Sequence, residues 1–185
     1  MKARLLVVFL FSAGMTACAQ PAPPPAPPAP PPSTKVTDSL KIQANIVKGY
    51  LTKAAEQMPE AKYAFKATPD VRTFGQLIGH IADANYLFCG YSSGEKKPAD
   101  SAEKLAKKAD LQKALADSFA YCDRAYAGVN DTTGAAEVKV EDIGQTLSKL
   151  GVLAFNTSHD FEHYGNIVTY MRLNKMVPPS SQQGQ

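Results

Sequence analysis

The sequence predicts an all-α protein built as a four-helix bundle, and three observations indicate this fold class. Apolar residues recur at steps of three and four residues in four separate stretches, which is typical of amphipathic helices. Segments that contain Gly and Pro separate these stretches. No set of strands of any size is evident, and the region 36–181 is long enough to form one hydrophobic core.

The first and third helices are each expected to begin at a side chain that can cap a helix. The first should span about residues 37–58, with Thr37 or Asp38 as its cap. The third should span about residues 110–127, with Asp110 as its cap. Their apolar stripes then point into the bundle.

The second and fourth helices carry most of the residues of chemical interest. Thr73 and Gln76 form a capping-box pattern at the start of a helix over about residues 73–91. A long fourth helix is expected over about residues 146–174. The preceding segment, 128–144, resembles a loop, with a short stretch of undecided state at its centre.

The N-terminal segment has the pattern of an export signal. A basic start is followed by an apolar run that is too short to span a bilayer, so residues 1–17 are expected to be a signal peptide. Met15-Thr16-Ala17-Cys18 resembles a bacterial lipoprotein box, in which Cys18 would carry the lipid and become the mature N-terminus. Two alternatives remain open: cleavage by ordinary signal peptidase at Ala17-Cys18-Ala19, and an uncleaved anchor.

A Pro/Ala-rich linker over residues 18–35 is expected to follow the signal. Residues 21–32 contain nine Pro and three Ala, a composition that favours polyproline II and cannot form a core. Such a stalk could hold the domain 36–181 away from a membrane, or it could be a linker without further function. Residues 182–185 are expected to be a disordered tail, and the protein is expected at the periplasmic face of a bacterial membrane, or secreted.

Composition excludes several functional classes. Hydrophobic residues make up 44% and charged residues 20% of the 185-residue chain, which argues against disorder, collagen and a polytopic membrane protein. Removal of Lys2 and Arg4 with the signal leaves 18 basic residues against 17 acidic ones, or +1 instead of +3. A nearly neutral domain lacks the basic surface that nucleic acids require, so no nucleic-acid partner is expected. Contact with a membrane is expected only through the lipid anchor.

The three histidines of the chain can form one metal site. His159 and His163 are four residues apart, so on a helix they point about 40° apart and lie one turn apart along its axis. His80 lies on the apolar stripe of the second helix and points into the same core. Imidazole suits zinc, nickel, iron and copper, with zinc the first expectation and nickel the next. The alternative is that the histidines are hydrogen-bonded core residues.

Four polar side chains are candidates for supporting such a site. Asn156, Asn166 and Tyr170 fall near the histidine pair on the helical wheel and could hydrogen-bond ligand nitrogens or a substrate. Asp83 lies one turn after His80 and could contact it as a carboxylate.

Cys89 and Cys122 are expected to form a disulfide. If Cys18 is lipidated, these two cysteines remain in an oxidising compartment, on helices that neighbour each other in sequence. The alternative is a pair of buried free thiols.

Two segments resemble the DinB-like superfamily. Residues 72–86, Arg-Thr-Phe-Gly-Gln-Leu-Ile-Gly-His-Ile-Ala-Asp-Ala-Asn-Tyr, are similar to the second helix of these four-helix proteins. Residues 159–173, which begin His-Asp-Phe-Glu-His-Tyr, together with the Val-Pro-Pro-Ser-Ser of 177–181, are similar to the final helix and tail. The resemblance covers about residues 38–181.

The resemblance implies a bundle with a long crossover connection and one divalent ion, nickel or zinc. The ligands would be one His on the second helix and an H-x-x-x-H pair, positions that correspond to His80, His159 and His163. Relatives include thiol-dependent S-transferases and isomerases, and dimers are common, which implies a possible homodimer here. The export signal sets this chain apart, because low-molecular-weight thiol cofactors belong mainly to the cytosol.

Two functional interpretations follow. In the first, the chain is a metal-dependent hydrolase or transferase, because three imidazoles leave coordination positions open for water or a substrate of unknown identity. In the second, it is a lipoprotein that binds a metal or ligand without turnover. A purely structural role for the histidines is the remaining alternative.

Overall fold

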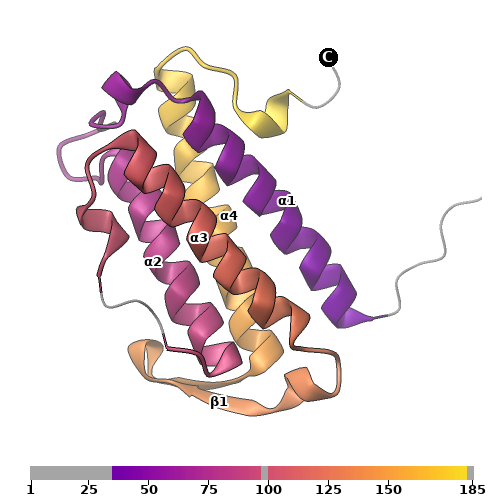
Figure 1. Ribbon diagram of the computed structural model, residues 1–185. Helices are drawn as coiled ribbons and strands as arrows, with labels where there is room; N and C mark the ends of the chain where they lie inside the picture. Colours follow the sequence, from indigo (N-terminus) through magenta and orange to yellow (C-terminus); the bar gives the residue numbers. More distant parts are fainter. Residues whose placement is uncertain (1–34, 97–99, 183–185) are drawn as a thin grey trace, which may run out of the picture. The chain divides into compact units, whose positions relative to one another are not determined.

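The computed structural model describes residues 35–96 and 100–182, and the fold is a four-helix bundle (Figure 1). The expected signal peptide 1–17, the lipidation candidate Cys18 and the Pro-rich run lie outside the described residues. The four long helices are α1 (Val36–Gln57), α2 (Phe74–Ser93), α3 (Lys108–Ala127) and α4 (Lys149–Leu173). Short 3-10 helices are η1 (Glu60–Lys62), η2 (Ala102–Lys104), η3 (Thr133–Ala135), η4 (Glu141–Ile143) and η5 (Pro179–Ser181).

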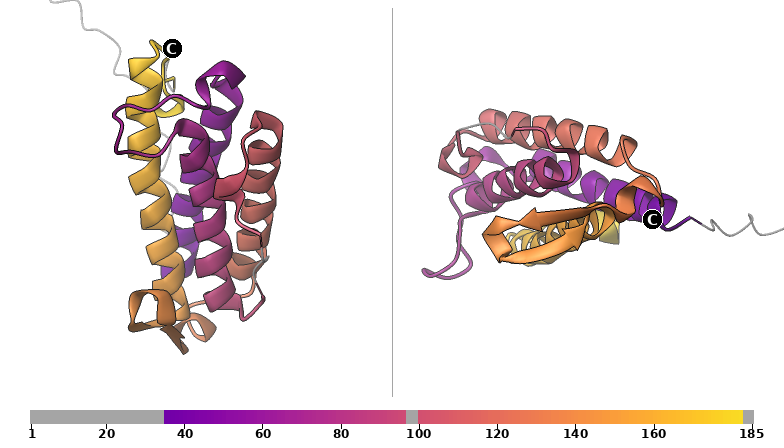
Figure 2. Two further views of the ribbon diagram at one scale, coloured as in Figure 1. Left: turned by 90° about the vertical axis from the view of Figure 1, so that its left-hand side faces the viewer. Right: turned by 90° about the horizontal axis from the view of Figure 1, so that it is seen from below.

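The bundle has the long crossover that the sequence resemblance implied. Helices α1 and α4 run in one direction and α2 and α3 in the other (Figures 1 and 2). Each of α1 and α2 packs against both α3 and α4, so consecutive helices α1 and α2 occupy opposite corners. Because α2 and α3 are parallel, the connection between them must run back along the length of the bundle. The η2 turn belongs to this connection and packs against α2.

The core is formed by the apolar stripes that the sequence indicated. Side chains from all four helices are fully buried in one cluster, and representative members are Leu51, Ile81, Leu111, Leu115 and Ile167. Burying a large aliphatic side chain contributes about 1.5–3 kcal/mol, so this cluster holds the four helices in register.

Local capping sets the start of α2, whereas a tertiary contact holds the start of α1. The capping box of Thr73 and Gln76 is confirmed by both reciprocal hydrogen bonds. The expected caps of α1 are wrong, because α1 begins after Lys35 and neither Thr37 nor Asp38 caps it. Asp131, distant in sequence, instead accepts hydrogen bonds from the backbone N–H of Thr37, at 2.8 Å, and from its hydroxyl.

The start of α3 also differs from the expectation. The helix begins at Lys108, with Lys107 at its N-cap position and no side-chain cap. Asp110 therefore lies inside the first turn, where its charge favours the helix dipole without capping a backbone N–H.

A β-hairpin precedes α4, in a region that the sequence assigned partly to a loop and partly to the helix. Strands β1 (Glu137–Val140) and β2 (Gln145–Ser148) pair antiparallel, with Glu137 opposite Ser148. The hairpin closes through Gly144, whose φ of 64° suits glycine. The expected helix start near residue 146 is wrong, because pairing buries Val140 against α2 and α4 while Ser148 caps α4.

A disulfide joins two parallel helices of the bundle. Cys89 on α2 and Cys122 on α3 are bonded, with their Cα atoms 5.2 Å apart. Beyond η5, the side chain of Gln57 donates to that of Gln182. Among the described residues, no helix is both long enough and apolar enough to cross a membrane.

Candidate metal centre

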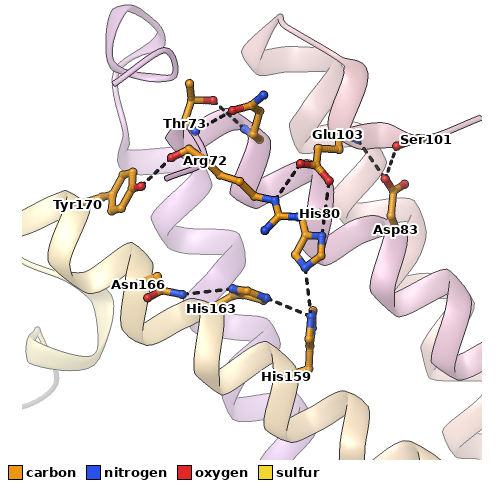
Figure 3. A network of polar contacts seen from close by, with 11 residues as sticks. Arg72, Thr73, His80, Asp83, Ser101, Glu103, His159, His163, Asn166 and Tyr170 are labelled. Atoms are coloured by element: carbon orange, nitrogen blue, oxygen red, sulfur yellow. Dashed lines mark hydrogen bonds and ion pairs between the residues drawn. The ribbon is translucent and has the colours of Figure 1, made fainter. Parts of the chain in front are cut away.

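Three histidine side chains converge between α2 and α4 (Figure 3). The Nε2 atom of His159 lies 3.2 Å from Nε2 of His80 and 3.0 Å from Nε2 of His163. The potential ligand atoms of all three residues lie within 4.8 Å of one another. These residues form the one group of three or more metal-ligating side chains with this geometry among the described residues.

The helices place these side chains in two steps. A spacing of four residues puts His159 and His163 on the same side of α4, one turn apart. The packing of α2 against α4 then brings His80 to face them. The structure therefore brings together all three histidines that the sequence singled out.

Two of the three distances between the nitrogens suit a shared metal ion. Two nitrogens bound tetrahedrally to one zinc at about 2.0–2.1 Å lie about 3.3 Å apart. The observed separations of 3.2 and 3.0 Å are close to that spacing. The donor set is three imidazoles, which suits zinc, nickel, copper or iron better than calcium or magnesium.

The contact at the second ring nitrogen of His80 favours the ligating form of that residue. Nδ1 of His80 lies 3.5 Å from Oε2 of Glu103, an arrangement that favours a proton on Nδ1 and leaves the lone pair on Nε2. Nδ2 of Asn166 donates to Nδ1 of His163 at 3.3 Å, a contact that places the ring proton of His163 on Nε2 until a metal displaces it. Nδ1 of His159 is buried and has no hydrogen-bond partner among the described residues.

The environment also keeps the imidazoles neutral. Burial is the main cause that lowers the pKa of His159 to about 4, and the neighbouring His163 and His80 contribute to the same shift. Burial is likewise the main reason that the pKa values of His80 and His163 are lowered. A neutral imidazole can ligate a metal, whereas a protonated one cannot.

Asp83 was expected to contact His80, but it binds the η2 turn instead. It has no hydrogen bond to His80; its carboxylate instead accepts from the backbone N–H groups of Ala102, at 2.7 Å, and Glu103, at 3.2 Å. The hydroxyl of Ser101 donates to the same carboxylate (Figure 3). Asp83 thus holds the η2 turn, and this turn holds Glu103 beside His80.

Gly79 makes this contact between the η2 turn and α2 possible. A Cβ atom at this position would lie 2.5 Å from the backbone oxygen of Ala102 and 2.5 Å from the Cα of Glu103. Only a residue without a side chain permits such a close approach of two backbones.

Arg72 and Tyr170 form a second set of contacts at the site. Nε of Arg72 donates to Oε1 of Glu103 at 2.8 Å, so Glu103 lies between a guanidinium and an imidazole. The hydroxyl of Tyr170 donates to the backbone oxygen of Arg72 at 2.6 Å. Tyr170 therefore fixes the position of Arg72, and has no hydrogen bond to a histidine.

The two asparagine candidates have different surroundings. Asn166 is exposed and contacts His163. Asn156 is buried, and its Nδ2 donates to Oδ1 of Asn85 at 3.0 Å, so it belongs to a polar cluster in the core and not to the histidine site. The helical wheel placed Asn156 about 60° from His159, a difference that is large enough to turn it toward another neighbour.

An open pocket lies beside His163, the one histidine of the three that lines it. Its volume is about 540 Å³, and His163, Asn166, Tyr170, Arg72 and Glu103 line part of it. Its size is within the range of small-molecule sites, about 300–1,000 Å³. A metal held by the three histidines would therefore lie next to a space that a small molecule can enter.

Sequence reasoning missed Glu103 and Arg72. Glu103 lies in the crossover connection, where no periodicity or spacing relates it to His80. Arg72 directly precedes the capping residue Thr73, and this position beside the start of α2 is the one signal that could have drawn attention to it.

The protein is a four-helix bundle in which three histidines with lowered pKa values converge. It therefore belongs to the class of helical bundles with a candidate metal centre. The family model for the DinB superfamily matches residues 45–167, so the chain belongs to this superfamily. No curated protein matches the chain.

Solved structures with the same fold include three relatives of low sequence identity. YfiT from Bacillus subtilis, described as a probable metal-dependent hydrolase with an unusual four-helix bundle topology, is 17% identical, with a TM-score of 0.61, covering 82% of this chain and 94% of YfiT. A DinB-like protein from Bacillus cereus is 12% identical, with a TM-score of 0.67, covering 77% of this chain and 95% of that one.

The third relative is a mycothiol-dependent maleylpyruvate isomerase. It is 16% identical, with a TM-score of 0.58, covering 71% of this chain. This chain spans 60% of the length of the isomerase. At such identities the three structures establish a shared fold and no shared activity.

Proposed function

We propose that the protein is a metal-dependent enzyme, a hydrolase or group transferase that acts on a small molecule. His80, His159 and His163 would hold one divalent ion, zinc or nickel. The observation that carries this proposal is the convergence of three neutral imidazoles beside an open pocket. Three protein ligands leave a coordination position free, which is typical of catalytic sites, whereas structural zinc sites have four protein ligands.

A bound ion would supply a Lewis acid and lower the pKa of a bound water toward about 7. The side chains around the site have more specific roles. Glu103 holds a proton on Nδ1 of His80 and so directs the lone pair of Nε2 toward the other two histidines. Arg72, fixed by Glu103 and Tyr170, places a positive charge at the pocket, where it can orient an anionic group.

The relatives support the choice of enzyme class in a limited way. One is described as a probable metal-dependent hydrolase and another as a mycothiol-dependent isomerase. Hydrolysis needs no co-substrate other than water, so it fits the export that the N-terminal sequence pattern predicts better than a reaction that depends on a cytosolic thiol.

Metal analysis and activity measurements on the purified full-length chain test the proposal. We expect one equivalent of zinc or nickel after loading, a metal-bound water that exchanges with solvent, and hydrolysis of small activated esters or amides. The variant with alanine at His80, His159 and His163 should lose all three properties. A metal with no exchangeable water and no turnover would contradict the enzyme and favour the alternative, a metal- or ligand-binding lipoprotein.

We also propose that the protein is exported and lipidated at Cys18, which would tether the domain to the periplasmic face of a membrane as a monomer or homodimer. The support is the sequence pattern of residues 1–17 and the Pro-rich linker that follows. Mass spectrometry of membrane-fraction protein should find a diacylglyceryl group on an N-terminal Cys18. A mature N-terminus at Gln20 would contradict lipidation while leaving export intact.

A further inference from the structure

A second pocket lies between α1, α3 and α4, on a different side of α4 from the histidines. Its volume is about 290 Å³. Ala44 of α1 and Phe119 and Tyr126 of α3 contribute apolar surface, while Asn156 and Asp160 of α4 contribute polar atoms. The pocket thus combines apolar surface with polar groups on each of its walls, because α1 and α3 also contribute Lys41, Asn45, Lys48 and Asp123.

Asp160 is the unusual residue in this pocket. It is only 2% exposed, and its buried Oδ1 has no hydrogen-bond partner among the described residues. Asn156 lies one helical turn away and is also 2% exposed, and its Oδ1 has no partner among these residues. Buried polar groups are almost always paired, so two adjacent unpaired acceptors indicate a missing partner.

The hydrogen bonds of the core explain why Asn156 presents its oxygen. The hydroxyl of Ser118 donates to the backbone oxygen of Leu115, so it can only accept from Nδ2 of Asn85. Oδ1 of Asn85 must then accept, and Nδ2 of Asn156 donates to it at 3.0 Å. This chain of donors leaves Oδ1 of Asn156 as an unused acceptor.

The two lysines and the tyrosine that line the pocket already have acceptors. Nζ of Lys48 forms an ion pair with Asp123 at 2.6 Å, and Nζ of Lys41 donates to the backbone oxygen of Val129 at 3.3 Å. The hydroxyl of Tyr126 contacts the backbone oxygen of Leu153 and the hydroxyl of Thr157. The unused acceptors of the pocket are therefore Oδ1 of Asn156 and Oδ1 of Asp160, and a ligand that matches them must have hydrogen-bond donors.

We propose that this pocket binds a small primary amine in its ammonium form. An ammonium group has three N–H donors and no acceptor, so it can bond to Asp160 and Asn156 together. The body of the amine would lie against Phe119 and Tyr126, which bury apolar surface and can attract a cation to their ring faces. This site does not depend on the metal centre or on its activity.

Three probes of matched size test the proposal on the full-length protein at neutral pH. Benzylamine is a cation, benzyl alcohol is neutral and benzoate is an anion, and all three carry the same ring. Calorimetry measures their affinities, and amide chemical shifts at Ala44 and Phe119 report whether the probe occupies this pocket. We expect benzylamine to bind at least tenfold more tightly than benzyl alcohol, and benzoate to bind most weakly.

Two variants of Asp160 and one control identify the group responsible. Asp160→Asn keeps the shape of the side chain, and Asp160→Leu fills the same space with an apolar group; both should remove the preference for benzylamine. Glu162→Gln removes an exposed carboxylate from the same helix and should leave the preference unchanged. The triple alanine variant of the histidines should bind benzylamine as the wild type does, even if the proposed metal function fails.

Three results would overturn the inference. Benzylamine and benzyl alcohol could bind equally, the preference could persist in both Asp160 variants, or the chemical shifts could change at the histidines and not at Ala44 and Phe119.

Discussion

The carboxylate of Glu103 lies 3.5 Å from Nδ1 of His80, although the two residues belong to a crossover turn and to a long helix. The contact depends on Asp83, which holds the turn, and on Gly79, which allows the turn to approach α2. The candidate metal centre thus includes part of a connection between helices, and its supporting residues can be tested separately from its ligands.

Replacing any one of the three histidines by alanine should lower the affinity for zinc by orders of magnitude. Each change removes one of three ligands, and the remaining two cannot enclose the ion. Competition with a chromophoric chelator measures the affinity. Glu162→Gln, which changes an exposed residue next to His163, serves as the control and should stay within about twofold of wild type. Unchanged affinity in the triple variant would place the site elsewhere.

Glu103→Gln should weaken zinc binding by about 10–100-fold, the usual effect of removing a carboxylate that orients a ligating histidine. Circular dichroism should show that the helices persist, because Glu103 lies outside the core. Glu141→Gln, at an exposed carboxylate paired with Lys139, is the matched control and should bind zinc normally. Equal affinities for the two variants would show that Glu103 does not support His80.

Gly79→Ala should destabilise the protein by about 1–3 kcal/mol, as overpacking usually does. The new Cβ would lie 2.5 Å from backbone atoms of the η2 turn, which cannot move as a flexible side chain can. The displaced turn should also weaken zinc binding. Gly49→Ala is the opposite case, because no atom lies within 4 Å of its Cβ position, and it should stabilise α1 by about 0.5–1 kcal/mol. Denaturant unfolding of both variants measures the contrast.

Acid should destabilise the metal-free protein through its histidines. Their pKa values are lowered in the folded state, for His159 to about 4, so below the ordinary value of about 6.5 the unfolded chain binds more protons. The free energy of unfolding should therefore be highest above pH 6.5 and fall as the pH drops toward 4. His159→Asn should flatten this dependence. A pH profile that is identical in wild type and His159→Asn would contradict the role of burial.

Reduction of the disulfide should lower the free energy of unfolding by about 3–4 kcal/mol. Cys89 and Cys122 are 33 residues apart, and the cross-link limits the conformations of the unfolded chain. Urea unfolding with and without a reductant measures the difference, and alkylation confirms the redox state. A Cys89→Ala/Cys122→Ala variant should be insensitive to the reductant. Equal midpoints for the oxidised and reduced wild type would show that the bond adds no stability.

Local patterns predicted the elements whose causes are local. The capping box at Thr73 depends on residues three positions apart, and the facing of His159 and His163 depends on one helical turn. The starts of α1 and α4 could not be predicted in this way. Asp131, which lies in the connection after α3, contacts Thr37 at the start of α1. Strand β1 pairs with β2 over residues 145–148, where the apolar periodicity predicted that α4 would begin.

The sequence by itself determined four amphipathic helices, the pairing of two histidines on one of them, and the one remaining imidazole that could join them, because helical periodicity converts spacing into direction. Only the tertiary structure decided which polar residues support the site. The crossover connection places Glu103 beside His80. Asp83 accepts a hydrogen bond from the η2 turn that carries Glu103, and it has no hydrogen bond to the histidine itself. Asn156 donates a hydrogen bond to Asn85. These contacts depend on how helices and connections pack against one another. No periodicity in the sequence indicates which residues that are distant along the chain come into contact.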